Sequence, residues 1–289
     1  MMSPYGPFAN AVHTVKSLRT MAAKYPTRMI AIALSVVTIV SITLFWPHDD
    51  IRGRSFAALI AAYPDALARF DDQTLYWRDG TAMPLSDGKD TKSFEQRLRR
   101  SSIADQLLLP YPRDLLDNPP FLDADPGRFR NTAFFEKMYG YCEKGEVSRR
   151  LVPLTWLPNT WGKIVQVTSI NGVDRRLKAV SAEIDALPAG VKRAAYPIAG
   201  TYNCRTVADT GLPSPHSYGI AIDLNLDFSD YWHWRPHTGH IDYRNHMPIE
   251  IVRIFERHGF IWGGKWYHFD TMHFEYRPEL LNVDGRRTQ

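Results

Sequence analysis

Charged residues are almost missing from the first 48 positions of this 289-residue sequence. Lys16, Arg19, Lys24 and Arg28 are the only Lys, Arg, Asp or Glu residues before Asp49. These four cations account for the whole net charge of +4, so the rest of the chain is neutral. The pI of about 9.0 therefore gives no reason to expect nucleic-acid binding, because the positive charge belongs to an N-terminal tail, residues 1–28.

The run from Met29 to Trp46 has no charged residue at all. A helix of this length crosses most of a hydrocarbon core about 30 Å thick, at about 1.5 Å per residue. Because the basic flank lies upstream, the N-terminus is expected in the cytoplasm and the remainder outside it. We therefore expect a single-pass anchor in the lipid bilayer of a bacterial cytoplasmic (inner) membrane. A cleaved signal peptide is the alternative, and a buried core helix is disfavoured because the run is apolar all round.

Cysteine is scarce as well, with only Cys142 and Cys204 in the chain. Two cysteines so far apart do not indicate a cysteine-based metal cluster. In an exported domain an even pair is readily oxidised, so we expect a disulfide, with two buried free thiols as the alternative. Closing a loop of about 60 residues would contribute about 4 kcal/mol in the chain-entropy model.

Internal repeats and low-complexity tracts are also absent, and a hydrophobic content of 44% allows a folded core. We treat residues 47–130 as an exported N-terminal segment or subdomain that precedes a domain at 131–289. The patterns predict a helix at 51–70, a hairpin at 75–83 around Asp79-Gly80, a helix at 93–106 and a connector at 111–130. Further along they predict an irregular apolar stretch at 151–158, strands at 163–170 and 196–204, and helices at 133–141, 173–187 and 248–258.

Two short stretches, 214–223 and 270–275, carry the residues that indicate chemistry. His216 and Asp223 are separated by Gly219, which permits a turn, so both side chains can converge from consecutive pieces of extended chain. His273 alternates with apolar neighbours and projects from one face of a predicted strand. Two imidazoles and one carboxylate suit a zinc ion that keeps a fourth position for water.

Two further carboxylates lie beside His273 in the sequence. Asp270 precedes it by three residues, so it is expected near the metal without ligating it, as the general base. Glu275 shares a face with His273, so we expect it to support that imidazole from behind; the alternative is that Glu275 is the base itself.

The pattern Ser-x-His-(6)-Asp, followed about fifty residues later by Asp-x-x-His-Phe-Glu, resembles the M15 metallopeptidases. This family includes D-alanyl-D-alanine carboxypeptidases and phage L-alanyl-D-glutamate endopeptidases, and residues 262–266 (Trp-Gly-Gly-Lys-Trp) look like the endolysin-like branch. The resemblance covers about 131–278. It implies an α+β fold of the Hedgehog/DD-peptidase type, with a small antiparallel sheet and flanking helices. It also implies Zn²⁺ held by His216, Asp223 and His273, with Asp270 as the catalytic carboxylate.

The same resemblance places Ser214 beside the substrate and gives Arg205 the role of a substrate-binding residue. A guanidinium can bind a substrate carboxylate in two places at once; an ordinary surface ion pair is the alternative for Arg205. The expected substrate is a peptide stem of peptidoglycan, cut at a D,D-carboxypeptidase bond or an L-Ala–D-Glu bond. A non-catalytic zinc domain that binds wall peptides or a protein partner is the competing function, although such a domain has no need of Asp270.

The remaining histidines receive other interpretations. Residues 228–247 are rich in Trp and His and lack periodicity, so we expect a long loop that forms a wall or lid beside the site. No His pair within it has the spacing of a structural zinc motif. His258 and His268 are expected to be structural.

Overall fold

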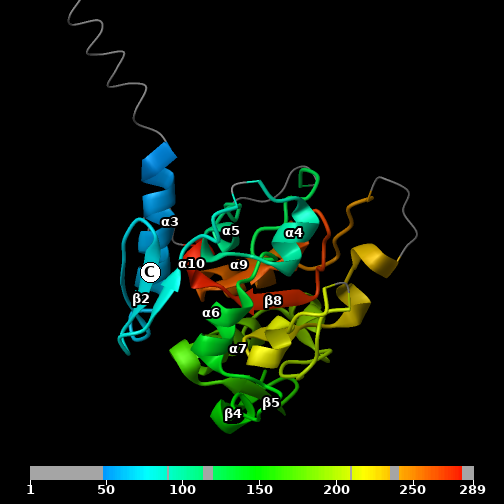
Figure 1. Ribbon diagram of the computed structural model, residues 1–289. Helices are drawn as coiled ribbons and strands as arrows, with labels where there is room; N and C mark the ends of the chain where they lie inside the picture. The colour runs from blue at the N-terminus through cyan, green and yellow to red at the C-terminus, as the bar shows by residue number, and fades with distance from the viewer. Residues whose placement is uncertain (1–47, 90, 113–119, 209, 235–240, 282–289) are drawn as a thin grey trace, which may run out of the picture. The chain divides into compact units, whose positions relative to one another are not determined.

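The computed structural model describes residues 48–89, 91–112, 120–208, 210–234 and 241–281 (Figure 1). The chain divides into two compact units, 1–53 and 54–289, and only the first residues of helix α3 (His48–Ala62) are described in the first unit. The membrane span predicted at 29–46 lies outside the described ranges. Within those ranges, no helix combines the length and apolar character needed to cross a bilayer.

An antiparallel sheet follows α3, in the order β1 (Leu67–Phe70), β2 (Thr74–Trp77) and β3 (Ala82–Pro84). The prediction of one helix as far as residue 70 is wrong. Pro64 lacks the amide hydrogen that a continuing helix requires, and the chain turns into β1 instead. The predicted hairpin is confirmed, with Gly80 at φ 84° in the turn between β2 and β3.

The helix predicted at 93–106 is two short helices, α4 (Phe94–Arg99) and α5 (Ile103–Gln106). Ser93 and Ser102 each cap the start of one of them, because each hydroxyl accepts a hydrogen bond from a backbone N–H three residues later. The second cap competes with a continuous helix, so the chain breaks just before it.

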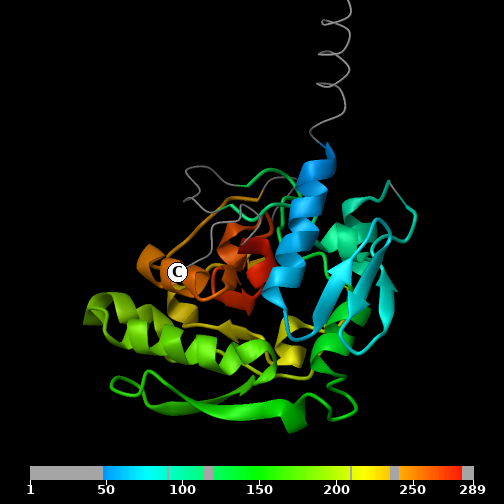
Figure 2. The ribbon, with the colours of Figure 1, turned by 90° about the vertical axis from the view of Figure 1, so that its left-hand side faces the viewer.

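The middle of the chain contains α6 (Thr132–Tyr139) and the two-stranded antiparallel sheet β4 (Leu151–Trp156) and β5 (Lys163–Thr168). Helix α7 (Val173–Asp185) lies along this sheet (Figure 2). The stretch at 151–158, predicted to be irregular, is mostly strand β4. Pro153 is compatible with it because each strand of a two-stranded sheet has a free edge, where a missing N–H costs little.

A second three-stranded antiparallel sheet positions the candidate site. Its order is β6 (Ala221–Asp223), β8 (His273–Tyr276) and β7 (Phe260–Trp262), so β8 is the central strand. Helix α9 (Ile249–Arg257) covers it, with the ring of Phe255 stacked on Phe274 at 4.0 Å between centroids. The mixture of helices and small antiparallel sheets confirms the α+β class.

The strand predicted at 196–204 is not formed as such, and this stretch contributes only an isolated bridge between Gly200 and Asp223.

The remaining elements of the described chain are short helices. The α-helices among these elements are α8 (Ala189–Lys192) and α10 (Pro278–Leu281). The 3-10 helices are η1 (Ser148–Arg150), η2 (Ile170–Gly172), η3 (Arg193–Ala195), η4 (Pro215–Tyr218), η5 (Leu226–Phe228), η6 (Trp232–Trp234) and η7 (Gly263–Lys265).

In the second unit, residues 54–289, buried charged side chains connect Tyr63 to strand β8 and the residues that follow it. Arg277 is fully buried; its Nε donates to Glu279 Oε1 at 2.6 Å and its Nη1 to Glu275 Oε1 at 3.0 Å. The hydroxyl of Tyr63, just after α3, donates to Glu279 Oε2 at 2.7 Å. Residues 54–112 also contribute buried side chains to the same hydrophobic core as β8. The described residues of 54–112 are therefore packed into the structure that carries the site.

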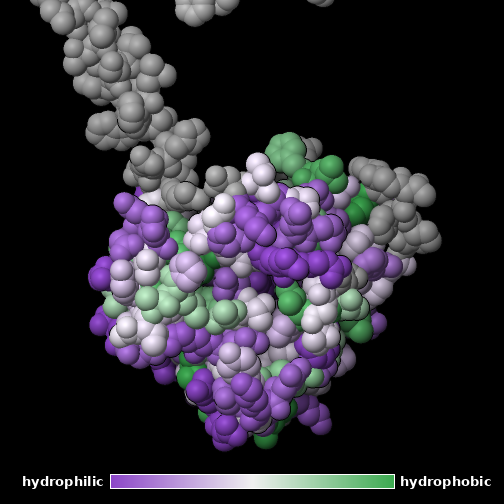
Figure 3. Space-filling model, viewed as in Figure 1, coloured by the Kyte–Doolittle hydropathy of each residue, from purple (hydrophilic) through white to green (hydrophobic). Residues whose placement is uncertain are grey.

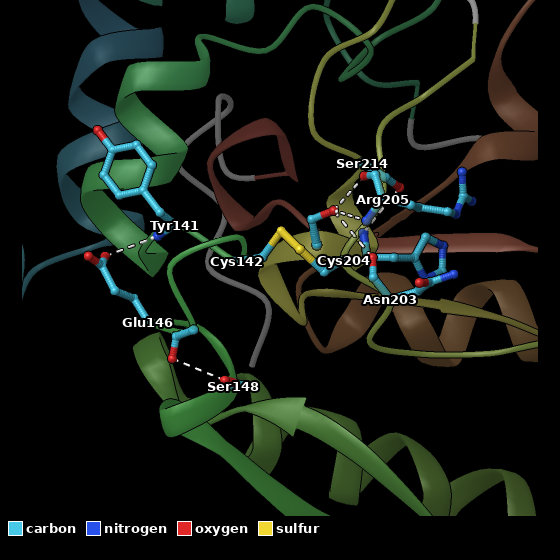
Figure 4. Close-up of a disulfide and its surroundings, with 11 residues drawn as sticks. Tyr141, Cys142, Glu146, Ser148, Asn203, Cys204, Arg205 and Ser214 are labelled. Atoms are coloured by element: carbon cyan, nitrogen blue, oxygen red, sulfur yellow. Dashed lines mark hydrogen bonds between the residues drawn. A yellow bond between two sulfur atoms is a disulfide. The ribbon is translucent and has the colours of Figure 1, made fainter.

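The disulfide predicted between Cys142 and Cys204 is present (Figure 4). It joins the turn after α6 to the segment that leads to Arg205. The carbonyl of Arg205 accepts hydrogen bonds from the Ser214 N–H, at 3.0 Å, and from the Ser217 hydroxyl, at 2.6 Å. The disulfide therefore restrains the chain shortly before the first motif stretch, residues 214–223.

Replacing Arg277 tests the buried charges. Arg277→Met leaves Glu275 and Glu279 buried without their shared cation, so the free energy of unfolding should fall by about 3–5 kcal/mol in urea titrations. The matched control is Arg257→Met, which removes a half-exposed partner of Glu183 and should change stability by at most about 1 kcal/mol. Equal effects of the two substitutions would show that the buried ion pairs do not stabilise the fold.

Candidate active site

Three side chains converge at one end of the β6–β8 pair. The candidate ligand atoms of His216, Asp223 and His273 all lie within 4.8 Å of one another. His216 Nε2 is 3.2 Å from Asp223 Oδ2 and 3.3 Å from His273 Nδ1, and His273 Nδ1 is 2.9 Å from Asp223 Oδ1. Ligands at about 2.0–2.2 Å around a tetrahedral ion lie about 3.3–3.6 Å apart, so the cluster is close to the size that a zinc ion requires.

Three elements, β6, β8 and η4, bring these ligands together. Asp223 and His273 are directly paired across β6 and β8. His216 lies on η4 rather than on extended chain, which corrects the predicted geometry. Ser214 caps η4, and Gly219 ends it in the left-handed conformation at φ 70°, where a Cβ would lie only 2.9–3.0 Å from Leu151 and from the Thr168 backbone. Extended chain from His216 would not return Asp223 to the same point, whereas this tight turn does.

The outer nitrogen of each imidazole has its own acceptor. His216 Nδ1 donates to the Thr201 carbonyl at 2.5 Å, and His273 Nε2 donates to Glu275 Oε2 at 3.1 Å. With these outer nitrogens as donors, the neutral forms of the two rings direct His216 Nε2 and His273 Nδ1 at the cluster as unprotonated nitrogens. A neutral imidazole nitrogen with its opposite N–H anchored is the ligand form that zinc binds, so the donor set fits the metal.

Glu275 is fully buried behind His273. It accepts hydrogen bonds from Arg130 Nη2 at 2.6 Å and Arg277 Nη1 at 3.0 Å, in addition to the imidazole. Burial raises the pKa of this carboxyl, but the charges of the two arginines and the hydrogen bond from His273 have the larger, opposite effect. The pKa of Glu275 therefore lies well below its usual value. Glu275 is therefore an ionised acceptor with both oxygens occupied. Neither arginine can be predicted from the sequence, since their positions follow no motif.

Asp270 differs from Glu275 in its surroundings. It is half-buried in the wall of the same cavity, and its Oδ1, which is itself buried, has no hydrogen-bond partner among the described residues. Burial and the nearby charge of Asp223 raise its pKa to about 6. Its position is fixed by the backbone, because its N–H donates to the Gly263 carbonyl at 3.0 Å and a Cβ on Gly263 would lie 2.5 Å from the Asp270 carbonyl. A carboxyl of this kind can take up and release a proton near neutral pH.

The cavity around the cluster is lined mainly by polar and aromatic side chains. Hydrophilic residues also predominate on the face that Figure 3 shows. Arg205 and Ser214 lie in this cavity, as the resemblance implies, although the buried Ser214 hydroxyl also accepts from the His216 N–H at 3.4 Å. The other wall residues include Arg128, Arg130, Tyr218, Tyr231, Trp232, Trp266 and His268.

The segment rich in Trp and His lies beside this cavity. Tyr231 forms an isolated bridge with Asp270, and the Trp232 N–H donates to the Phe269 carbonyl at 3.0 Å. Residues 235–240 of the predicted loop lie outside the described ranges. The two histidines interpreted as structural differ: His258 pairs with Glu183, whereas His268 is part of the cavity wall.

A comparison with protein families supports this site independently. Residues 208–276 match a family model described as D-alanyl-D-alanine carboxypeptidase, and the match contains all three candidate ligands and Asp270. Searches of curated proteins and of solved structures gave no match. Residues 208–276 are therefore similar to the M15 peptidases, and the motifs and the geometry of the cluster agree with that similarity.

Proposed function

We propose that this protein is a zinc-dependent peptidase of the M15 type, which hydrolyses amide bonds in the peptide stems of peptidoglycan. The observation that carries the proposal is the unpartnered Asp270 Oδ1 in the same cavity as the convergent ligands of His216, Asp223 and His273. A purely structural metal site needs no unoccupied buried carboxyl oxygen, whereas hydrolysis needs a proton acceptor at that place.

The surroundings of the metal ligands, Asp270 and Glu275 indicate a different role for each of them. A zinc ion bound by the three ligands would polarise the scissile carbonyl and acidify a water molecule. Asp270 would take the proton from the attacking water at Oδ1 and give it to the leaving nitrogen as the C–N bond breaks. A pKa of about 6 keeps Asp270 mostly ionised at neutral pH and still able to donate afterwards. Glu275 is less suited to this role because its oxygens are already bound.

Arg205 supports a substrate that carries a carboxylate. Its side chain lines the cavity, and its backbone is fixed by Ser214, Ser217 and the neighbouring disulfide. Arg205 is exposed, and a guanidinium in the cavity wall suits the terminal carboxylate of a D-alanyl-D-alanine stem. The L-Ala–D-Glu bond is the second candidate, and the description of the matched family favours the first.

The location of the enzyme is part of the proposal. The apolar run at 29–46 and its basic upstream flank would anchor the chain in the cytoplasmic membrane of a bacterium, with the peptidase unit outside the cytoplasm. The disulfide supports that side of the membrane, because such bonds persist in oxidising compartments.

Asp270→Asn tests the role of the base. The amide has the same shape but cannot accept the proton, so kcat on purified stem peptides should fall by about 10²–10⁴-fold. Zinc content, measured by atomic absorption, should stay at the wild-type level. The control Asp227→Asn removes an exposed carboxylate near the site and should leave both quantities unchanged. Full activity of Asp270→Asn would rule out its role as the base.

Metal removal tests the ligand set. Chelation should abolish hydrolysis of stem peptides, and added zinc should restore it in the wild-type protein. His273→Ala should remain inactive at the same zinc concentration and should bind less zinc, because the site then keeps two ligands. If the chelated protein or His273→Ala retained wild-type activity, the chain would not use this cluster for catalysis.

A further inference from the structure

Asp125 is a fully buried carboxylate that supports two residues of the cavity wall. It accepts hydrogen bonds from His268 Nδ1 at 2.7 Å, from the His268 backbone N–H at 3.0 Å and from Arg128 Nη1 at 2.9 Å. Burial raises the pKa of Asp125, but the imidazole hydrogen bond and the charge of Arg128 lower it to below its usual value. A buried ionised group of this kind is costly, and both residues that donate hydrogen bonds to this carboxylate line the cavity.

The ring of His268 is held in one orientation. It stacks on Phe94 at 5.2 Å between centroids and meets Trp232 edge to face at 4.6 Å. Because Nδ1 is bonded to Asp125, Nε2 is the polar atom left for the cavity, and it has no hydrogen-bond partner within the described residues. With the proton fixed on Nδ1, Nε2 of the neutral ring is a hydrogen-bond acceptor.

Arg128 supplies the complementary group. One of its nitrogens is bonded to Asp125, and the remaining N–H groups of its guanidinium are donors in the wall of the same cavity. An acceptor and a donor supported by one carboxylate match the N–H and C=O of a peptide group. Neither the three metal ligands nor Asp270 forms a hydrogen bond with this pair, so the proposed chemistry at the metal leaves it unused.

We propose that His268 Nε2 and the Arg128 guanidinium form a subsite for a backbone peptide group of the substrate away from the scissile bond. The inference rests on the proposed peptidase function and narrows its substrate class. A subsite of this kind favours stem peptides that extend several residues from the cleaved bond over dipeptides that contain little more than that bond. It is separate from Arg205 and Ser214, which lie in another segment of the chain.

His268→Phe provides the test, because it keeps an aromatic ring beside Phe94 and Trp232 but removes both nitrogens. In the zinc-loaded full chain, kcat/KM should fall about tenfold for a stem pentapeptide and stay unchanged for a dipeptide with the same scissile bond. Arg128→Gln, a second variant, should show the same selective loss. His258→Phe is the matched control, since His258 also pairs with a carboxylate, Glu183, but does not line this cavity. An equal loss on both peptides, or no loss on either, would overturn the subsite.

Binding measurements separate this inference from the proposed function. The zinc-loaded Asp270→Asn protein can be titrated with the same two peptides and followed by tryptophan fluorescence. Tighter binding of the pentapeptide, lost in the double variant with His268→Phe, supports the subsite even if the wild-type protein cleaves neither peptide. Equal affinity for both peptides in the presence of intact His268 contradicts it, whatever the catalytic result.

Discussion

The site depends on the buried ion pairs that lie behind His273. Glu275, Arg277 and Glu279 are fully buried, and the hydroxyl of Tyr63 donates to Glu279. Charges taken out of water are costly unless they are paired and hydrogen-bonded, and Arg277 binds both carboxylates, although its Nη2 has no partner among the described residues. Glu275 accepts a hydrogen bond from Nε2 of His273, and this bond directs Nδ1 of the same ring at the cluster. Packing around α3 and the chemistry at β8 are thus parts of one arrangement.

Three imidazoles around the cavity are each oriented by a hydrogen bond to a fixed acceptor. A fixed acceptor holds one nitrogen of each imidazole: the Thr201 carbonyl for His216, Glu275 for His273 and Asp125 for His268. Each acceptor decides where the proton lies and which nitrogen faces the cavity. Asp270 is the contrasting group, because its buried Oδ1 has no hydrogen-bond partner within the part of the chain that the structure describes. The difference between supported and unsupported groups separates residues that bind from the residue proposed to move a proton.

The sequence predicts the parts of this structure that depend on local pattern. Alternation locates β5 and β8, helical periodicity locates α7 and α9, and the motif spacing selects the residues that form the His–Asp–His cluster. The pattern does not reveal β4, because Pro153 argues against a paired strand, and it misplaces His216, whose turn requires a tertiary contact around Gly219. Arg130 lies 145 positions from its partner Glu275, a separation at which one sequence carries no pairing signal. The support of His268 by Asp125 is hidden for the same reason.

The most direct measurement is a crystal structure of the zinc-loaded protein with anomalous data collected at the zinc edge. The account predicts one strong peak at about 2.0–2.2 Å from His216 Nε2, His273 Nδ1 and a carboxylate oxygen of Asp223, with Asp270 nearby but not ligating. A zinc ion bound through other residues, or ligated directly by Asp270 in place of one of the three, would contradict it.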